Sequence, residues 1–503
     1  MNLYVYETAR NAVVVDCGVM FPNASMPGVD CLYPRMDYLK QIKKKIDGIV
    51  FTHGHEDHIG GVDMLVDILR VPIYTGAFTA RLVEHKLSYG QTKAEIKVVD
   101  GQRSHEIGGF KIDFVRLPHS IPDTYGLRLT SGDFSALHMS DLRADNFNKL
   151  AASLKTDNLT CLLLDSTNAN SSNKINISEE EVYENLVKLF KQAKGRIFFT
   201  TFASNVTRVS SVARAAKRVG RKIVIVGAAM ERTTLIAKEM GLIDLPDDML
   251  LTANTAFHEP ADDLVYMAGG CQGEFASALH SIAFDERRVI KMSDDDTLIF
   301  SSRAIPGNEM NISAVINAAM RLGADVVQAS DEFVHTSGHI TPKDAEMLIK
   351  ALKPKYFIPI HGEYMHIKKN IDVAVKSGVR ADNCLLMESG EKLIFRDSSF
   401  MNKREVPSGR LYADHRGNYL FDDDGLNVRR QLARDGLVLL GLDGKGVRVR
   451  TYGFTMSNAQ STQLKGMLKD IHTGVKGGRD LIIRTVRRYF RKYQDRRPVV
   501  EIL

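Results

Sequence analysis

The stretch IVFTHGHEDHIGG, residues 49–61, decides how the rest of this chain is interpreted. It opens with an apolar, β-branched run and then places three histidines, a glutamate and an aspartate within six consecutive positions. A run of this kind predicts a buried strand, and the titratable residues would lie on the loop that leaves it. Such a loop is expected to carry function and not only to connect two elements.

The spacing within this loop favours metal binding. His53 and His55 can reach one point, whereas Asp57 and His58, on the following turn, reach a second point nearby. Imidazole nitrogens and carboxylate oxygens suit zinc or manganese. A loop with one or two histidines is usually only a surface loop, but H-x-H-x-D-H followed by two glycines is much more specific. The glycines allow the backbone to turn tightly into the next helix.

One loop cannot fill two metal spheres, so further ligands are expected at other strand ends. The candidates are His119 in RLPHSIPD, Asp141 in LHMSDLRAD and His361 in FIPIHGEY, each of which follows an apolar run. Taken singly, each could be a plain loop residue. Together they complete two metal sites bridged by a carboxylate. Two metals about 3.5–4 Å apart suit phosphoester cleavage, because they generate hydroxide and stabilise the developing oxyanion.

The pattern along the chain predicts more than one domain in its 503 residues. Residues 11–170 contain short strands that end in polar residues or glycine. Ser178 and Glu181 then have capping-box spacing at the start of a helix, and alternating strands and helices follow, which predicts a parallel α/β domain. The chain after about residue 400 is polar and turn-rich and ends in a basic helix.

Composition narrows the location and the partners. The five cysteines include no C-x-x-C pair, and no run is long or apolar enough for a membrane helix, which favours a reducing cytoplasm and excludes a membrane partner. The formal net charge is +6, and the last forty residues are rich in Lys and Arg. That segment favours a polyanion, although a solvated helix face is an equally good interpretation.

The motifs together resemble a known family. H-x-H-x-D-H resembles the metallo-β-lactamase superfamily, and the later blocks resemble its β-CASP nucleases, in particular the ribonuclease J family. These blocks occur in the same order in this chain: LLLDSTNAN, TFASNVTRV, GGCQGE, SSRAIPGNE, HTSGH and IPIHGEY. The resemblance implies an α/β protein, with a metallo-β-lactamase αββα sandwich, an inserted β-CASP parallel α/β domain and a small C-terminal α+β domain.

The implied domain limits follow the motifs. The metallo-β-lactamase domain would occupy residues 1–175 and close with residues 331–400. The β-CASP domain would lie between them, at 176–330, and a linker with a short C-terminal domain would occupy 401–503.

The resemblance also assigns metal ligands. It implies one metal held by three histidines, a second held by an aspartate and two histidines, and a bridging aspartate: His53, His55 and His119; Asp57, His58 and His361; and Asp141. A hydroxide between the metals would attack the phosphodiester, which makes Asp57 and Asp141 catalytic in this scheme. The histidine-rich first site favours zinc, and manganese remains open.

Substrate contacts are implied around the HTSGH block. His339 would contact the scissile phosphate and assist the leaving oxygen, with His335 a weaker candidate for the same role. Ser337, Gly338 and Ser204 would offer hydroxyl or backbone donors to phosphates. A capping or loop histidine is the simpler interpretation of His339, as an ordinary loop serine is of Ser204.

The implied activity is 5′-to-3′ exonuclease and endonuclease cleavage of single-stranded RNA, with a 5′-monophosphate end favoured, in RNA processing and mRNA decay. A homodimer or homotetramer and partners in an RNA-degradation complex are also implied.

Several features depart from the family pattern. The family normally has another strand before residue 1, so either the start is misassigned or that first strand is missing, which would expose a sheet edge. Thr207 replaces a common histidine, and SDLRAD replaces Gly-Asp-Phe but keeps Asp141. The segment after residue 400 is shorter than usual. A structural calcium ion, seen in some relatives, would use Asp414.

Two other functions share some of these features. A small-molecule hydrolase, such as a thioesterase or lactonase, would share the metal motif but would not need the α/β insert or HTSGH. A non-catalytic RNA-binding subunit of a degradation complex would not need the complete ligand set.

Overall fold

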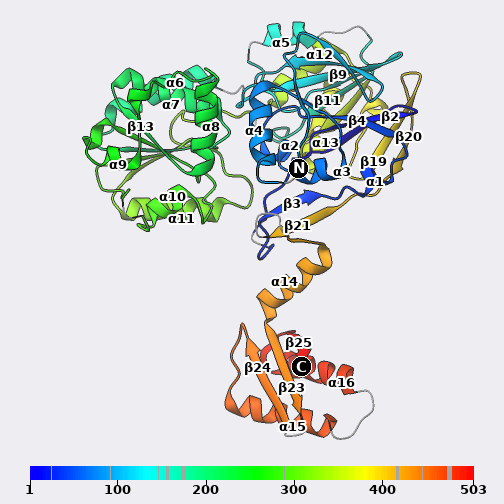
Figure 1. Cartoon of the computed structure of the whole chain (residues 1–503), viewed down its shortest axis with the longest axis vertical. Coiled ribbons are helices and arrows are strands. Elements are labelled where there is room, and N and C mark those ends of the chain that lie inside the picture. Colours follow the sequence, from blue (N-terminus) through cyan, green and yellow to red (C-terminus); the bar gives the residue numbers. More distant parts are fainter. Residues whose placement is uncertain are drawn as a thin grey trace. The chain divides into compact units, whose positions relative to one another are not determined.

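The computed structural model describes residues 1–503 apart from 24, 91, 146, 155–157, 172–176, 288, 415–418, 444–445 and 473–477. The chain forms two compact units, Met1–Val19 with Pro34–Gly409 (unit 1) and Met20–Tyr33 with Arg410–Leu503 (unit 2) (Figure 1). The expected domain limit at 175/176 lies outside the described residues. The expected limit at 401 falls within β20 (Ser399–Glu405), which belongs to unit 1 and pairs with β19 (Glu391–Arg396).

Two sheets pack face to face in unit 1. The first has the order β1 (Tyr4–Glu7), β2 (Asn11–Val15), β4 (Lys45–Val50), β5 (Ile73–Thr75), β6 (Ile96–Val98). The second has the order β18 (Tyr356–Ile360), β11 (Cys161–Asp165), β10 (Phe134–His138), β9 (Tyr125–Ser131), β8 (Phe110–Arg116), β7 (Ser104–Ile107). Val13 and Val50 of the first sheet share a buried cluster with Leu127 of the second, so apolar faces from both sheets form the inner core. β1 and β6 lie at the two edges of the first sheet.

Helices cover the outer face of each sheet. Ile49 of β4 is buried in one cluster with residues of α3 (Val62–Ile68) and α4 (Ala77–Leu87). Leu162 of β11 is buried in another with residues of α5 (Phe147–Leu154), α12 (Pro342–Leu352) and α13 (Tyr364–Lys376). The result is the expected αββα sandwich.

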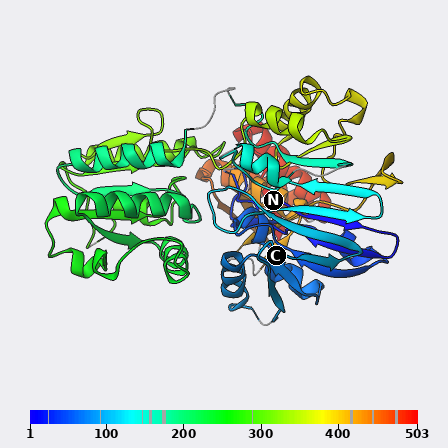
Figure 2. The same ribbon diagram turned by 90° about the horizontal axis from the view of Figure 1, so that it is seen from above.

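The inserted segment is a parallel α/β domain with helices on both faces of its sheet (Figure 2). Its strand order is β14 (Leu250–Leu251), β13 (Lys222–Val226), β15 (Leu264–Ala268), β12 (Ile197–Thr200), β16 (Thr297–Phe300), β17 (Asp325–Gln328). One face carries α6 (Glu179–Gln192), α7 (Val206–Val219) and α8 (Ala228–Glu239), and the other α9 (Ala253–Ala256), α10 (Ala278–Ala283) and α11 (Glu309–Arg321). The predicted capping box of Ser178 and Glu181 starts α6.

Unit 2 contains two small sheets. One joins β22 (Tyr419–Phe421), β21 (Arg410–Asp414) and β3 (Cys31–Pro34), and is followed by α14 (Asp423–Asp435). The other has the order β24 (Gly446–Tyr452), β23 (Leu437–Asp443), β25 (Val499–Ile502) and packs against α15 (Asn458–His472) and α16 (Gly478–Gln494). No helix in the described part of the chain is long and apolar enough to cross a membrane.

Candidate metal centre

The predicted ligands lie together because the strands before them end at one edge of the sandwich. Strands β10, β11 and β18 are parallel and in register, with His138 opposite Leu163 and Asp165 opposite Ile360. Asp141 and His361 follow the ends of β10 and β18. The H-x-H-x-D-H loop follows the end of β4, in the facing sheet, and passes into the short helix α2 (Glu56–Ile59).

Left-handed backbone turns end three of these strands. Asp16 after β2, Ser140 after β10 and His361 after β18 have φ values of 59°, 44° and 56°. A non-glycine residue rarely adopts such a φ, and each instance costs about 1–3 kcal/mol. Strain of this kind is typical of functional sites, and here it falls on or next to the residues that converge.

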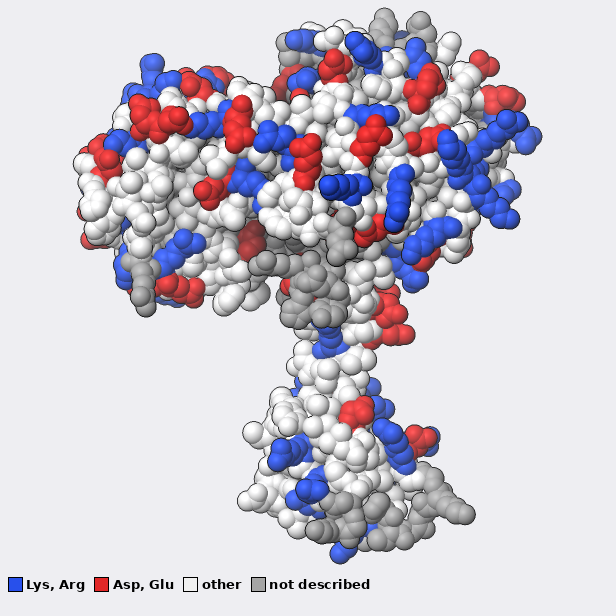
Figure 3. Space-filling view, viewed as in Figure 1, with Lys and Arg blue, Asp and Glu red and all other residues white. Residues whose placement is uncertain are grey.

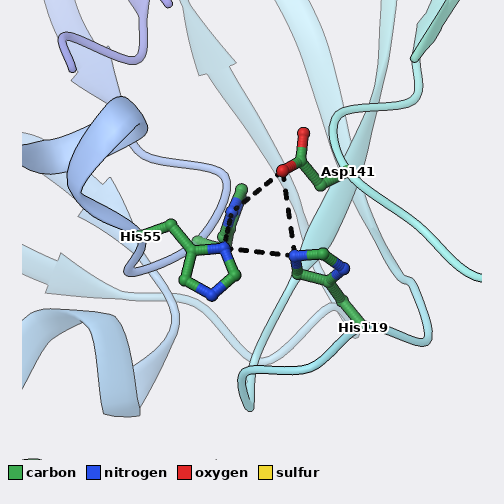
Figure 4. Close-up of side chains that lie close together, drawn as sticks. His55, His119 and Asp141 are labelled. Atoms are coloured by element: carbon green, nitrogen blue, oxygen red, sulfur yellow. Dashed lines mark hydrogen bonds and ion pairs between the residues drawn. The ribbon is translucent and has the colours of Figure 1, made fainter. Parts of the chain in front are cut away.

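The first group of side chains is rich in histidine. His55 Nδ1 lies 3.0 Å from His53 Nε2 and 3.2 Å from His119 Nε2 (Figure 4). Asp141 Oδ2 lies 3.7 and 3.8 Å from the Nε2 atoms of His53 and His119. Ligands about 2.0–2.1 Å from a tetrahedral zinc are about 3.4 Å from one another. The spacing in this group is that of ligands around one cation.

The second group contains two carboxylates and two imidazoles. His361 Nε2 lies 3.0 Å from Asp57 Oδ2 and 3.3 Å from Asp141 Oδ1. His58 Nε2 lies 3.5 and 3.4 Å from the same two oxygens. The two oxygens of Asp141 thus face different groups, Oδ2 the first and Oδ1 the second, which is the arrangement that a bridging carboxylate needs.

The donor set fits divalent cations. Within the described residues, Asp141 Oδ1 is a buried oxygen without a hydrogen-bond donor, a costly state unless a cation lies beside it. Several carboxyl groups surround this centre: Asp57 and Asp141 belong to the ligand groups, Asp165 lies beside Asp141 and Asp16 contacts His58, an arrangement that suits divalent cations. The residues present therefore suit two divalent metals, as the sequence predicted.

Burial prepares the first group for binding a metal. It lowers the pKa of His53 and His119 well below the usual value and that of His55 to about 4. These imidazoles are therefore neutral near pH 7, the form in which histidine binds a metal. The pKa of Asp57 is also lowered, because His58 and His361 outweigh the opposite effect of burial.

Neutral oxygens orient the histidines of the first group. His119 Nδ1 donates a hydrogen bond to the carbonyl oxygen of Gly338, at 2.7 Å. His53 Nδ1 lies 3.1 Å from the hydroxyl of Thr52. Such contacts fix which ring nitrogen is free to face a metal.

The second group has charged support. His58 Nδ1 contacts Asp16 Oδ2 at 2.7 Å, and Asp16 also accepts a hydrogen bond from the backbone N–H of Thr52 at 2.8 Å. His361 Nδ1 lies 2.7 Å from the hydroxyl of Thr167, which donates to Asp165 Oδ1 at the same distance.

The chain after β2 holds the backbone of the second group. Cys17 N–H donates to the carbonyl of His58 at 2.7 Å, and Gly61 N–H donates to Cys17 at 2.8 Å. At Gly18 a β-carbon would lie 1.6 Å from the carbonyl oxygen of Asp57, so no other residue fits without moving that turn.

His339 lies beside both groups. Its Nδ1 is 2.7 Å from Asp165 Oδ2 and 3.9 Å from Asp141 Oδ2, and it shares a third cluster with Asp141, Asp165 and His361. Burial lowers the pKa of His339, but Asp165 and Asp141 outweigh it and raise that pKa to about 9. The ring is half-buried at the rim of the centre.

The other predicted substrate residues have different surroundings. His335 Nδ1 donates to the carbonyl of Ser301 at 3.2 Å, and burial lowers its pKa to about 3. Ser337 is buried, and its hydroxyl accepts hydrogen bonds from Asn168 and from the N–H of His339. Gly338 supports His119, as described above, and Ser204 is half-buried in the turn before α7.

Three more residues from the sequence analysis have defined positions. The hydroxyl of Thr207 donates to the carbonyl of Ser120 at 3.2 Å, next to His119. Glu56 pairs with Lys86 at 2.7 Å and belongs to none of the ligand clusters in the part of the chain that the structure describes. Asp414 pairs with Arg429 and belongs to none of the ligand clusters found among the described residues.

The sequence analysis missed Asp16, Asp165 and Thr167 as supporting residues. Asp16 directly follows the apolar strand in NAVVVDCG, and Asp165 is the last residue of the apolar strand in TCLLLDST. Asp141 has a similar place, three residues after the end of β10. That shared position was the available signal.

Family models match three parts of the chain: "Beta-lactamase superfamily domain" over residues 12–223, "Ribonuclease J, beta-CASP domain" over 194–319 and "Zn-dependent metallo-hydrolase RNA specificity domain" over 326–382. The α/β domain described above is thus β-CASP-like, as expected.

Proteins named Ribonuclease J are similar over most of the chain. That of Helicobacter pylori is 34% identical over 87% of this chain and 65% of its own length. That of Sinorhizobium meliloti is 33% identical over 87% and 79%, and that of Thermus thermophilus 32% identical over 99% and 92%. This chain therefore spans less than two thirds of the length of the Helicobacter protein.

A solved structure shares the fold. A protein of unknown function from Enterococcus faecalis aligns with a TM-score of 0.54 at 14% identity, over 77% of this chain and 94% of that one.

Proposed function

This chain belongs to the ribonuclease J family, and on that premise we propose that it is a metal-dependent ribonuclease. It cleaves single-stranded RNA as a 5′-to-3′ exonuclease and as an endonuclease, favours a 5′-monophosphate end, and acts in RNA processing and mRNA decay. One observation carries the proposal: two ligand groups meet at one sheet edge and share the two oxygens of Asp141.

The proposed ligands follow the two groups. His53, His55 and His119 would hold the first metal, Asp57, His58 and His361 would hold the second, and Asp141 would be shared between them. When bound, two such metals supply a nucleophilic hydroxide and stabilise charge on the phosphate oxygens. Zinc is favoured by the neutral, histidine-rich first group, and manganese is the alternative.

His339 positions the substrate in this proposal. Its ring is hydrogen-bonded to Asp165, which fixes its orientation, and lies close to Asp141. It contacts the scissile phosphate and donates a proton to the leaving oxygen. Ser204, His335, Ser337 and Gly338 supply the weaker phosphate contacts, some of them through the backbone.

Two alternatives fit less well. A thioesterase or lactonase would not need the β-CASP domain or the RNA specificity domain that the family models match. A non-catalytic subunit would not need seven intact ligands. All five cysteines are free thiols, which supports a cytoplasmic location, and a homodimer or homotetramer and degradation-complex partners complete the proposal.

The test is degradation of one RNA prepared with a 5′-monophosphate, 5′-triphosphate or 5′-hydroxyl end, with Zn²⁺ or Mn²⁺ and after chelation. Metal-dependent release of mononucleotides, fastest from the monophosphate, is expected. Stable RNA in every metal, with metal bound, would contradict the nuclease assignment. Hydrolysis of thioesters by the same sample would point to the small-molecule alternative.

A further inference from the structure

The positive charge of the chain is concentrated at its C-terminal end. Residues 437–503 contain 14 Lys and Arg against 5 Asp and Glu, a net charge of +9. The whole chain has a net charge of +6, so residues 1–436 together carry −3. Of these two parts, the last segment is therefore the one whose net charge favours a polyanion.

Helix α16 divides this segment into an apolar and a basic face. Ile482, Val486 and Phe490 are buried against the β24-β23-β25 sheet. Four arginines at i, i+3, i+4 and i+7 lie on the opposite face and are exposed: Arg484, Arg487, Arg488 and Arg491. This arginine stripe extends over about 10 Å of the helix. Lys and Arg side chains are prominent on the visible surface of this unit (Figure 3).

The arginine stripe lacks counter-charges. Its four side chains form no ion pair with any residue that the structure describes. Two exposed cations on the β-CASP domain are paired instead: Arg214 with Glu180 at 2.9 Å and Lys217 with Asp244 at 2.6 Å. Like charges three and four residues apart destabilise a helix, so the stripe is unfavourable unless an anion binds it.

We propose that the arginine stripe of α16 is a second RNA-binding surface, which holds the phosphate backbone of single-stranded RNA separately from the metal centre. The inference rests on the proposed function for its choice of polyanion. Arginine suits phosphate better than lysine does, because its planar fork donates two parallel hydrogen bonds.

A membrane surface fits the same face less well. An interfacial helix needs an exposed apolar face beside its cations. The apolar face of α16 is buried in the core of unit 2, with Val486 and Phe490 fully covered. The stripe therefore has positive charge but no exposed apolar helix face to insert into a bilayer, which is typical of a site for a phosphate backbone.

The test replaces all four stripe residues by glutamine, which keeps helix propensity. Binding of a fluorescent single-stranded RNA is followed by anisotropy across a salt series, in an Asp57→Ala background so that RNA is not consumed. The stripe variant should bind roughly tenfold or more weakly at low salt, and each lost contact should lower the slope of log K against log salt by about 0.7.

The control removes the same charge elsewhere, by Lys188→Gln, Lys191→Gln, Arg214→Gln and Lys217→Gln. If the control lowers affinity and slope as much as the stripe variant does, or neither variant changes them, the stripe is not an RNA site. Circular dichroism establishes that both variants are folded.

Two further outcomes would also overturn the inference. The stripe variant would lose self-association in sedimentation, with RNA affinity unchanged, if the stripe were a protein interface. If the stripe bound a membrane surface, the stripe variant would lose binding to phosphatidylglycerol vesicles while its RNA affinity stayed unchanged. If the wild-type chain cleaved no RNA, but RNA binding was still lost on replacing the arginine stripe, the proposed function would be contradicted and the RNA-binding role of the stripe would stand.

Discussion

The two candidate ligand groups share Asp141 and one sheet edge, yet they are built from different chemistry. The first is three neutral imidazoles oriented by Thr52 and the Gly338 carbonyl, and His53 is fully buried. The second adds Asp57, whose side chain is 37% exposed, and is oriented by the carboxylate of Asp16.

This difference separates two tasks that one cluster must perform. A closed set of neutral nitrogens holds a cation tightly and in fixed geometry, as structural metal sites do. An open set with carboxylates leaves room for a substrate oxygen and has more charge to offset its exposure. We therefore expect the first group to retain its metal and the second to exchange it.

The largest effect is expected from Asp57→Ala. The substitution removes a ligand that belongs to the second group alone, so cleavage should be abolished while the metal of the first group is retained. Metal content by mass spectrometry and RNA cleavage are the measurements. Glu56→Gln is the matched control, because this neighbouring carboxylate pairs with Lys86 and belongs to neither ligand group. Cleavage by the Asp57→Ala variant at the wild-type rate would contradict the two-metal mechanism.

The next largest effect is expected from His339→Ala, which leaves both ligand groups intact. Loss of a general acid typically costs about 10²- to 10⁴-fold in rate. Single-turnover cleavage should fall in that range while RNA affinity changes little. His335→Ala, in the same loop but bonded to Ser301, should have a much smaller effect on the rate. Weakened RNA binding with an unchanged single-turnover rate would assign His339 to binding alone.

A smaller loss is expected from Asp16→Asn, which keeps the shape of the support but removes its charge. Altering such a support typically costs about 10- to 100-fold in metal affinity or activity. Because Asp16 contacts His58 directly and reaches His53 only through Thr52, the larger loss of affinity should fall on the second group. Titration of metal into the chelated protein measures both affinities. An equal loss at both groups would show that they are not independent.

The smallest effect is expected from Thr167→Val, which removes the neutral hydroxyl beside His361. The net value of such a hydrogen bond is about 0.5–1.5 kcal/mol, so activity should fall about twofold to thirteenfold. The measurement is kcat/KM on a 5′-monophosphorylated RNA. A loss as large as that of Asp16→Asn would mean that charge is not what distinguishes the second group.

The sequence predicted which side chains would converge because apolar strands end where a polar residue begins. His119, Asp141 and His361 could each be found from that rule. The parallel register of β10, β11 and β18 brings Asp141 and His361 together. His119 reaches the same edge because it follows β8, which runs in the direction of β10, both strands being antiparallel to β9. The roles of His339 and Asp141 came from the family resemblance, since spacing alone cannot show which oxygen faces which group.

Other parts could not be predicted, for physical reasons. Strand β15, at the centre of the β-CASP sheet, has only the five residues LVYMA, a run equally compatible with a helix. Residues 20–33 join unit 2 through the pairing of β3 with β21, a long-range contact that leaves no local pattern. Asp16 was missed because a supporting carboxylate and an ordinary turn aspartate look alike in one sequence.

Gly18 binds nothing, yet a single β-carbon there would overlap the carbonyl of Asp57. The positions of Asp57 and His58 therefore depend on the close approach of a main-chain segment whose residue, Gly18, is not a ligand. In an evolving or engineered chain, the metal site can therefore be altered by substitutions of two kinds: those of the ligands, and those of residues that pack against the backbone of the ligands. A screen of variants that scores ligand identity alone would count Gly18→Ala as competent, because its ligand set is complete. The backbone that carries two of those ligands would nevertheless be displaced.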